Sequence, residues 1–285
     1  METTTDKKQQ PARLSTARSR ELGEELRRVR HRARMSSGFV AEALGWSLGK
    51  LSKLETGSRG TSTWEIGTLL GRCGADKPTR DRILAIASEP DTGSLMRVHN
   101  QSPDSVLAVL LHEQAARTIT TYEPLTVPSL VQTEDYARAL TGNELAVTSR
   151  MSRQESVRRV NRPDTVVYIH EAALRIAVGG PKVTRDQLLH LTIMCGWPRM
   201  SPRVIPMSTE STTALRHPAT LLTFAAPTKP LAYTETDTAT VLHDDPQAVT
   251  TYEIKMRHLA RRALPTAQSR DIFARWADAY DQETR

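Results

Sequence analysis

The sequence predicts an N-terminal all-α domain of five helices at residues 19–89, joined to a C-terminal α+β domain at 105–285 in which helices flank a small sheet. Three observations support this fold class. Apolar residues recur at helical spacing in the first segment. Residues 90–104 are rich in Pro, Gly, Ser, Asp and Asn, which is typical of a linker. Beyond them, β-branched runs alternate with helical patterns, which favours an α+β domain.

The N-terminal helices are predicted from their apolar faces and end signals, after a disordered arm at residues 1–18 that shows no periodicity. The first helix starts at Ser19, and its apolar face repeats at spacings of four, three and four residues at Leu22, Leu26, Val29 and Ala33. The last helix carries Pro78 near its start, where the fixed φ of proline suits a helix. The four later helices are expected at 36–44, 47–56, 63–73 and 78–89.

The C-terminal elements follow from β-branched runs, prolines and capping patterns. Two prolines make residues 123–128 extended, and Thr184-x-x-Gln187 matches a capping box. Strands are expected at 165–169, 203–207, 220–224, 231–234 and 239–243. Helices are expected at 105–116, 133–140, 147–160, 185–195, 246–263 and 267–280.

Two short helices meet at a tight turn between residues 35 and 57. Gly45 can adopt a positive φ and end the first helix, Ser47 can cap the second, and Leu51 and Leu54 can anchor the second helix in a core. Its outer face is then small or cationic. A helix in the DNA major groove needs such a face, because its first residues approach base edges while lysines meet phosphates.

One register of small, apolar and glycine residues runs through these two helices, at Ala41, Leu44-Gly45, Ser47, Leu51-Ser52, Leu54-Glu55 and Gly57. With this register, residues 19–75 resemble the Cro/repressor-like helix-turn-helix family of the xenobiotic-response-element type. The resemblance implies binding of double-stranded DNA through a recognition helix at 47–56. The DNA-binding residues that it implies are Ser36, Ser37, Ser47, Leu48, Gly49, Lys50, Ser52, Lys53 and Arg59.

Two positions of the recognition helix depart from the family pattern. Many relatives carry long polar side chains where this sequence has Leu48 and Gly49. We therefore expect few direct hydrogen bonds to bases, and Leu48 can instead contact a thymine methyl group.

The positive charge lies almost entirely in the same third of the chain. Residues 1–90 hold 17 Lys and Arg against 11 Asp and Glu, so they carry +6 of the net +7. Attraction to a phosphate backbone favours such a basic domain attached to a near-neutral one. A solvated arginine-rich tail gives a similar balance, so the charge alone leaves both interpretations open.

The C-terminal segment carries a second family pattern. The stretch 125–140, followed by Arg153-Gln154, Glu171 to Arg175 and Val178-Gly179-Gly180, resembles the uncharacterised C-terminal domain of WhiJ-like actinobacterial regulators. Where that family usually has Val-Pro-Gly-Leu-Leu, this chain has Val-Pro-Ser-Leu-Val. The resemblance implies a transcriptional regulator, often encoded beside a small acidic partner protein, and implies no chemistry for the domain.

Five arginines on and just after the expected helix 147–160 have two interpretations. They are a solvated helix face or a docking face for an acidic partner protein. The candidate partner-binding residues are Arg150, Arg153, Arg158, Arg159 and Arg162.

No sequence pattern indicates a catalytic, metal-binding or phosphate-binding site. The eight histidines include no pair at metal-ligand spacing, no serine lies in a Gly-x-Ser-x-Gly elbow, and the stretch 45–52 departs from a phosphate-binding loop in spacing and at Leu51. We therefore expect no enzyme, no cofactor and no metal site. Cys73 and Cys195 are expected to be free thiols in a reducing cytoplasm.

Two further features bear on location. The chain contains no apolar run of about 18 residues that could span a membrane, and residues 1–20 lack the apolar core of a secretory signal. We therefore expect a cytoplasmic, nucleoid-associated protein without a membrane partner.

Together these patterns predict a homodimeric transcription regulator, because a two-fold protein matches two half-sites about 34 Å apart. The C-terminal domain is expected to serve dimerisation and the binding of a small partner protein or effector. Two alternatives of a different class stay open: an interaction module that captures a small acidic partner, or a small-molecule sensor, each with DNA binding as its output.

Overall fold

The computed structural model describes residues 15–99 and 107–284, and these divide into two compact units at Thr92–Gly93. Each unit has its own buried core, and each is described by itself below. The predicted disordered arm at residues 1–18 lies mainly outside the described residues, but Ala17 and Arg18 belong to the first helix.

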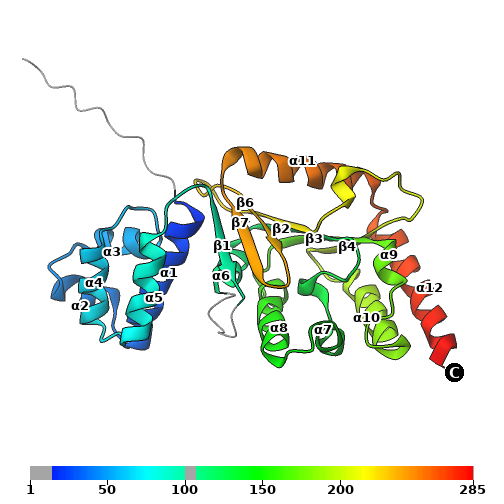
Figure 1. Ribbon diagram of the computed structural model, residues 1–285, viewed down its shortest axis with the longest axis horizontal. Helices are drawn as coiled ribbons and strands as arrows, with labels where there is room; N and C mark the ends of the chain where they lie inside the picture. The colour runs from blue at the N-terminus through cyan, green and yellow to red at the C-terminus, as the bar shows by residue number, and fades with distance from the viewer. Residues whose placement is uncertain (1–14, 100–106, 285) are drawn as a thin grey trace, which may run out of the picture. The chain divides into compact units, whose positions relative to one another are not determined.

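The described part of the N-terminal unit contains the five predicted helices (Figure 1). They are α1 (Ala17–Arg32), α2 (Ser37–Ala43), α3 (Leu48–Glu55), α4 (Thr63–Arg72) and α5 (Lys77–Ser88). Each begins after a residue whose side-chain oxygen accepts a backbone N–H of the first turn, which satisfies one of the donors left free at a helix start. These caps are Thr16, Ser36, Ser47, Ser62 and Asp76.

One aliphatic core joins the five helices. All of them contribute fully or almost fully buried side chains: Leu22, Leu26, Val29, Val40, Ala41, Leu51, Leu54, Ile66, Leu69, Leu70, Ile83 and Ile86. The end of α5 is tied to the start of α1, because the Arg18 guanidinium donates to the carbonyl oxygens of Ala87 and Glu89. The sequence-based prediction of an all-helical unit is confirmed.

The described part of the C-terminal unit is built on a mixed seven-stranded sheet in the order β1-β7-β6-β5-β2-β3-β4. Strands β2, β3 and β4 are parallel, and the other pairs are antiparallel. The strands are β1 (Ser94–Val98), β2 (Thr118–Glu123), β3 (Asp164–His170), β4 (Met200–Ile205), β5 (Ala219–Thr223), β6 (Leu231–Glu235) and β7 (Ala239–His243).

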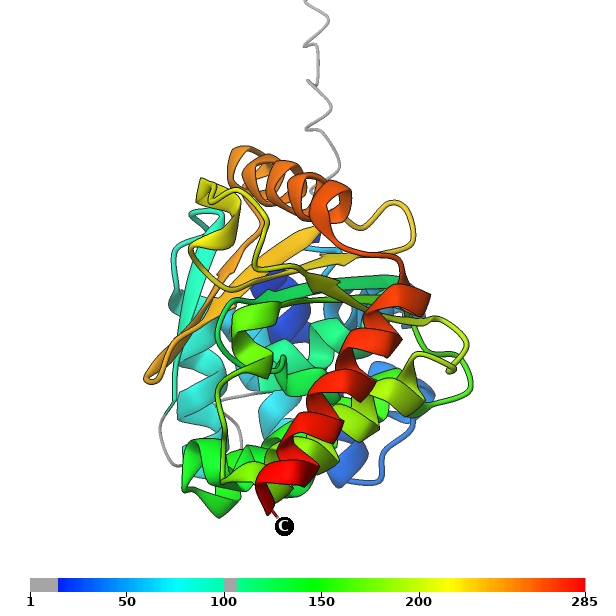
Figure 2. The ribbon, with the colours of Figure 1, turned by 90° about the vertical axis from the view of Figure 1, so that its right-hand side faces the viewer.

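Helices cover both faces of this sheet. Helix α11 (Pro246–Arg262) lies over one face, where it packs on Tyr122, Tyr168 and Leu221. The other face carries α7 (Glu134–Thr141), α8 (Glu144–Arg158), α10 (Pro181–Met194) and α12 (Thr266–Thr284) (Figures 1 and 2). The shorter elements are α6 (Leu107–Ala115), η2 (Ser129–Val131), α9 (Glu171–Leu174) and η3 (Thr213–Leu215). The predicted α+β class, with helices flanking a sheet, is thus confirmed.

Several boundaries differ from the prediction because long-range pairing decides them. Residues 94–98, expected in the linker at 90–104, form β1 and pair with β7. Helix α10 starts at Pro181 and not at the predicted capping box, since the Thr184 hydroxyl bonds the backbone of Val178 instead. Strand β2 was missed, although residues 118–122 are all β-branched or aromatic and so carry a strand signal.

Candidate nucleic-acid interface

Helices α2 and α3 are joined by a turn that local chemistry specifies. The Ser36 hydroxyl accepts the Phe39 N–H and the Ser47 hydroxyl accepts the Lys50 N–H, each at 3.1 Å. Gly45 between them has φ +64°, the left-handed conformation in which glycine replaces other residues at helix ends. The predicted Ser47 cap and Gly45 turn are therefore confirmed, and Ser36 is the cap of α2.

Helix α3 lies backbone-to-backbone against α1 at two glycines. A Cβ atom on Gly23 would lie 2.5 Å from the carbonyl oxygen of Glu55, and one on Gly57 would lie 2.2 Å from that of Ser19. Neither position has room for a side chain, so both glycines set the distance between the two helices. Gly57 was expected from the sequence, whereas Gly23 was not, because it lies inside a helical pattern without any local signal.

A buried ion pair fixes the C-terminal end of α3. The Arg30 Nε and Nη2 atoms donate to the two carboxylate oxygens of Glu55 at 2.6 and 2.9 Å, and Nη1 donates to the Met35 carbonyl at 2.9 Å. Both side chains are less than one-tenth exposed. The Arg30 guanidinium therefore connects α1, the segment before α2 and the end of α3. These bonds fix the orientation of α3 within the unit.

The outer face of α3 is exposed and bears small side chains. Ser47, Leu48, Gly49, Ser52 and Lys53 all lie at the surface, and Leu48 is 59% exposed. A Cβ atom at Gly49 would meet nothing within 4 Å. Among the described residues, no carboxylate pairs with Lys53. The structure thus brings these five predicted residues together on one helix face, with Ser36 exposed and Ser37 half-buried at the start of α2.

The two other predicted cations, Lys50 and Arg59, share one carboxylate. The Lys50 Nζ lies 2.8 Å from a Glu65 oxygen and 4.2 Å from the centre of the Trp46 ring, and Arg59 reaches the same oxygen at 3.2 Å. The hydrogen bond from Lys50 lowers the pKa of Glu65 to about 2. Glu65 also closes a capping box with Ser62 at the start of α4. This cluster joins α3 to α4 and holds both cations in place.

Two exposed aromatic residues flank the same helices and were missed by the sequence analysis. Trp64, next to Glu65 on α4, is 72% exposed, and Phe39 on α2 is 48% exposed under the Arg72 guanidinium, 5.0 Å from the ring centre. Their signal was an aromatic residue in the first turn of a helix but off its apolar stripe.

The arginines predicted as a partner-docking face do not form one face. Arg153 is buried at 3% exposure, and Arg150 is half-buried, donating to the Gln132 side chain at 2.9 Å. Helix α8 ends at Arg158, so Arg159 and Arg162 lie beyond it. Assigning Arg153 to a docking face was wrong, because its guanidinium meets buried carboxylates that are distant in sequence.

Arg153 is the centre of a buried polar network. Its Nε and Nη2 donate to the two oxygens of Glu113 at 3.0 and 2.8 Å, and its Nη1 donates to Glu235 at 2.7 Å. The Tyr233 hydroxyl donates to Glu113 at 2.6 Å and accepts from Arg153 at 3.0 Å. Burial by itself lowers the pKa of Arg153, but the carboxylates of Glu113 and Glu235 have the larger combined effect and raise it. The network ties α6, α8 and β6 together.

Glu123, which has Glu235 as a neighbour, lies at the edge of this network. Strand register places Glu123 of β2 on the same sheet face as Tyr233 and Glu235 of β6. Burial and the neighbouring Glu235 raise the pKa of Glu123 to about 8, against the opposing effect of Arg150 and Lys255. At neutral pH the Glu123 carboxyl is therefore protonated.

This raised pKa predicts that the C-terminal unit loses stability as the pH rises. Between pH 4.5 and 8 the folded state holds a proton on Glu123 that the unfolded state releases, so the stabilisation is complete below pH 4.5 and is lost through about pH 8. We expect Glu123→Gln to unfold at a higher temperature than the unsubstituted chain at pH 9, and at a similar temperature at pH 5. Thermal unfolding from pH 5 to 9 measures this, with the exposed Glu134→Gln as control. An unchanged pH profile in the Glu123 variant would contradict the assignment.

Comparison with known families agrees with this geometry. A capped helix, a glycine turn and a second helix with an exposed outer face define the helix-turn-helix class, whose domains bind DNA. A family model described as a helix-turn-helix domain matches residues 21–83. A second model, described as a domain of unknown function (DUF5753), matches residues 106–275, and the chain belongs to this family. None of the curated proteins compared with the chain matches it.

The described residues contain neither a membrane-spanning helix nor a cluster of metal ligands. Within residues 15–99 and 107–284, no helix has both the length and the apolar character needed to cross a membrane. The described side chains also contain no group of three or more His, Cys, Asp or Glu placed to hold a metal ion.

Proposed function

We propose that the protein is a sequence-specific, DNA-binding transcriptional regulator of the Cro/repressor-like type that inserts α3 into the major groove. The observation that carries this proposal is the exposed face from Ser47 to Lys53, which is small, basic at its end and rigidly oriented by the Arg30–Glu55 pair. A helix with such a face approaches base edges without steric hindrance.

The residues have distinct roles in this arrangement. Leu48 contacts a thymine methyl group, while Ser47 and Ser52 reach polar base edges. Lys53 meets a phosphate, and Lys50 and Arg59, held by Glu65, present their charges beside the groove. Since the face holds no long amide or guanidinium side chain, much of the specificity comes from DNA shape and from the spacing of two half-sites.

The C-terminal unit completes the proposal. We assign to it dimerisation and the binding of an effector or a small acidic partner protein, and we place the regulator in the cytoplasm at the nucleoid. Arg158 and Arg159 remain exposed at the end of α8 beside Val160, which is 96% exposed. These residues, and not the whole predicted arginine set, support partner docking.

The Gly49→Glu substitution tests DNA binding through α3 without lowering the stability of the fold. A glutamate at this open helical position should raise helix stability by several tenths of a kcal/mol, about the difference between glycine and a good helix former. It should also place a carboxylate against DNA phosphates and lower the affinity by about 10- to 100-fold, an expected cost of about 1–3 kcal/mol. The measurement is fluorescence anisotropy on the full chain, with a DNA site selected from a random pool at low salt.

The matched control is Gly71→Glu, which adds the same charge at an open position near the end of α4. Equal losses of affinity in the two variants would show that net charge alone drives binding, and the assignment of α3 would be lost. If the unsubstituted chain selects no DNA site at low salt, the proposed function itself fails. The size of the complex on one half-site and on two half-sites reports dimerisation.

A further inference from the structure

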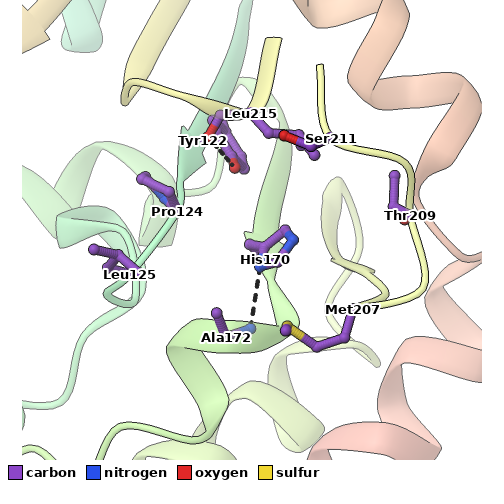
Figure 3. Close-up of a pocket in the computed structure, with 9 residues that line it drawn as sticks. All are labelled: Tyr122, Pro124, Leu125, His170, Ala172, Met207, Thr209, Ser211 and Leu215. Atoms are coloured by element: carbon purple, nitrogen blue, oxygen red, sulfur yellow. Dashed lines mark hydrogen bonds between the residues drawn. The ribbon is translucent and has the colours of Figure 1, made fainter. Parts of the chain in front are cut away.

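A cavity of about 320 Å³ opens where the three parallel strands of the C-terminal unit end (Figure 3). Its lining comes from the last residues of β2 and β3, from the segments that follow these strands, and from the chain between β4 and β5. This size lies at the lower end of the range of small-molecule sites, which are usually concave and mainly apolar.

The strand order explains why a cavity forms at this place. The chain runs outward from β2 through β3 to β4, and then returns to pair β5 on the opposite side of β2. The returning segment, residues 206–218, must therefore pass the carboxyl ends of the parallel strands. In open sheets with parallel strands, ligands bind outside these carboxyl ends where the strand order reverses.

The walls of the cavity expose polar and apolar surface in about equal amounts. Six of the nine lining residues carry apolar side chains or an aromatic ring: Tyr122, Pro124, Leu125, Ala172, Met207 and Leu215. The Tyr122 hydroxyl donates to the Leu215 carbonyl at 3.1 Å, which fixes the returning segment over the strand ends. A compact apolar group therefore finds preformed walls in this cavity.

His170 supplies a directed hydrogen-bond donor within these walls. Its Nδ1 accepts the Ala172 N–H at 3.2 Å, so in the neutral ring the proton resides on Nε2. Figure 3 shows this second nitrogen pointing away from Ala172, among the other lining residues. Among the described residues, none accepts a hydrogen bond from Nε2. The hydroxyls of Thr209 and Ser211 add two further donors to the lining.

The charges around the cavity favour an anion. None of the nine lining residues is acidic, and the Lys255 Nζ lies 5.5 Å from the centre of the Tyr122 ring. The neighbouring Glu171 is already engaged, because one of its oxygens accepts the Met207 N–H at 2.9 Å and the other lies 3.6 Å from Arg175. Lys255 is not part of the lining, and its Nζ donates to the His217 carbonyl. A carboxylate in the cavity thus meets the hydrogen-bond donors of the lining without an unpaired acidic neighbour.

We propose that this cavity binds a small apolar carboxylate, whose hydrocarbon part packs on the Tyr122 and Leu215 side and whose oxygens accept from His170 Nε2 and the two hydroxyls. Binding itself is independent of DNA. Only the role of this ligand as an effector of the regulator rests on the proposed function.

The test uses the full chain with phenylacetate and octanoate as probes and their neutral amides as isosteres. Isothermal calorimetry should give a Kd of about 1 mM or tighter for at least one acid, as expected for a ligand of about ten non-hydrogen atoms, and binding at least tenfold weaker for its amide. The proposal is overturned if the amides bind as tightly as the acids. It is also overturned if neither acid binds at a concentration about tenfold above the expected Kd.

Two variants locate the binding site. His170→Asn keeps an acceptor for the Ala172 N–H but removes the Nε2 donor, and Ala172→Phe fills the cavity without removing a polar side chain. Each should weaken acid binding at least tenfold while the unfolding temperature without probe stays near that of the unsubstituted chain. His258→Asn, at an exposed site on α11, is the matched control. Undiminished binding in both cavity variants places the acid elsewhere and refutes the site. DNA anisotropy on the same proteins tests the proposed function separately.

Discussion

Replacing Arg30 with methionine is expected to unfold the helix-turn-helix unit at temperatures at which the C-terminal unit stays folded. The substitution removes the partner of both Glu55 oxygens and leaves a buried carboxylate without a cation. Removing one member of a buried ion pair costs about 3–5 kcal/mol. In a domain of this size, each kcal/mol lowers the unfolding temperature by about 4–8 °C, so we expect a loss of about 12 °C or more.

Hydrogen-exchange mass spectrometry on the full chain resolves the two units, because peptides from residues 17–88 report the first and peptides from 107–284 the second. Arg27→Met is the matched control, since Arg27 is 54% exposed and lies 3.6 Å from Glu24. It should cost about 1 kcal/mol or less. Adding Glu55→Gln to the Arg30 variant should recover part of the loss. Equal protection of α1 and α3 in both arginine variants would mean that the buried pair contributes no stability.

Arg153→Met is expected to have the corresponding effect on the C-terminal unit. Glu113 is completely buried, and without Arg153 it keeps the Tyr233 hydroxyl as its neutral hydrogen-bond partner. The expected cost is again about 3–5 kcal/mol. In a unit of nearly 200 residues this corresponds to a fall of about 6 °C or more in the unfolding temperature. Exchange should rise first in α6, α8 and β6, the elements that the guanidinium joins.

The control for this variant is Arg138→Met. Arg138 bonds three carboxylates, those of Glu134, Asp135 and Glu144, against two for Arg153, but it is 41% exposed. Water screens these pairs, so the substitution should lower the unfolding temperature much less than Arg153→Met does. The contrast tests burial and not the number of partners. Similar unfolding temperatures for the Arg138 and Arg153 variants would contradict the assigned importance of the buried network.

The helix-turn-helix unit was predictable because its signals are local. Capping serines, the Gly45 turn and the apolar stripe of α1 each act within a few residues, and the structure places all of them as expected. The pairing of Lys50 with Glu65 was not predictable, since the two residues lie on different helices and nothing in either helix signals the other. The exposed face of α3 followed from the sequence, while its fixed orientation did not.

The C-terminal unit shows the opposite balance. Its class followed from β-branched runs and helical patterns, but β1 lay hidden in a segment with the composition of a linker. The cavity at His170 had no sequence signal, because its lining comes from two strand ends, the segments after them and a returning segment that only the sheet order brings together.

The sequence by itself determined the all-helical N-terminal unit, its helix-turn-helix register, the residues of the candidate DNA-binding face and the α+β class of the second unit. Periodicity, capping and glycine turns act over distances that a short stretch of chain contains. Only the tertiary structure decided which charges are buried. Arg153 is one of five similar arginines in sequence, and only its position opposite Glu113 and Glu235 distinguishes it from a solvated residue. The exposed face of α3 thus follows from local sequence, whereas the networks and the cavity arise from contacts between distant segments.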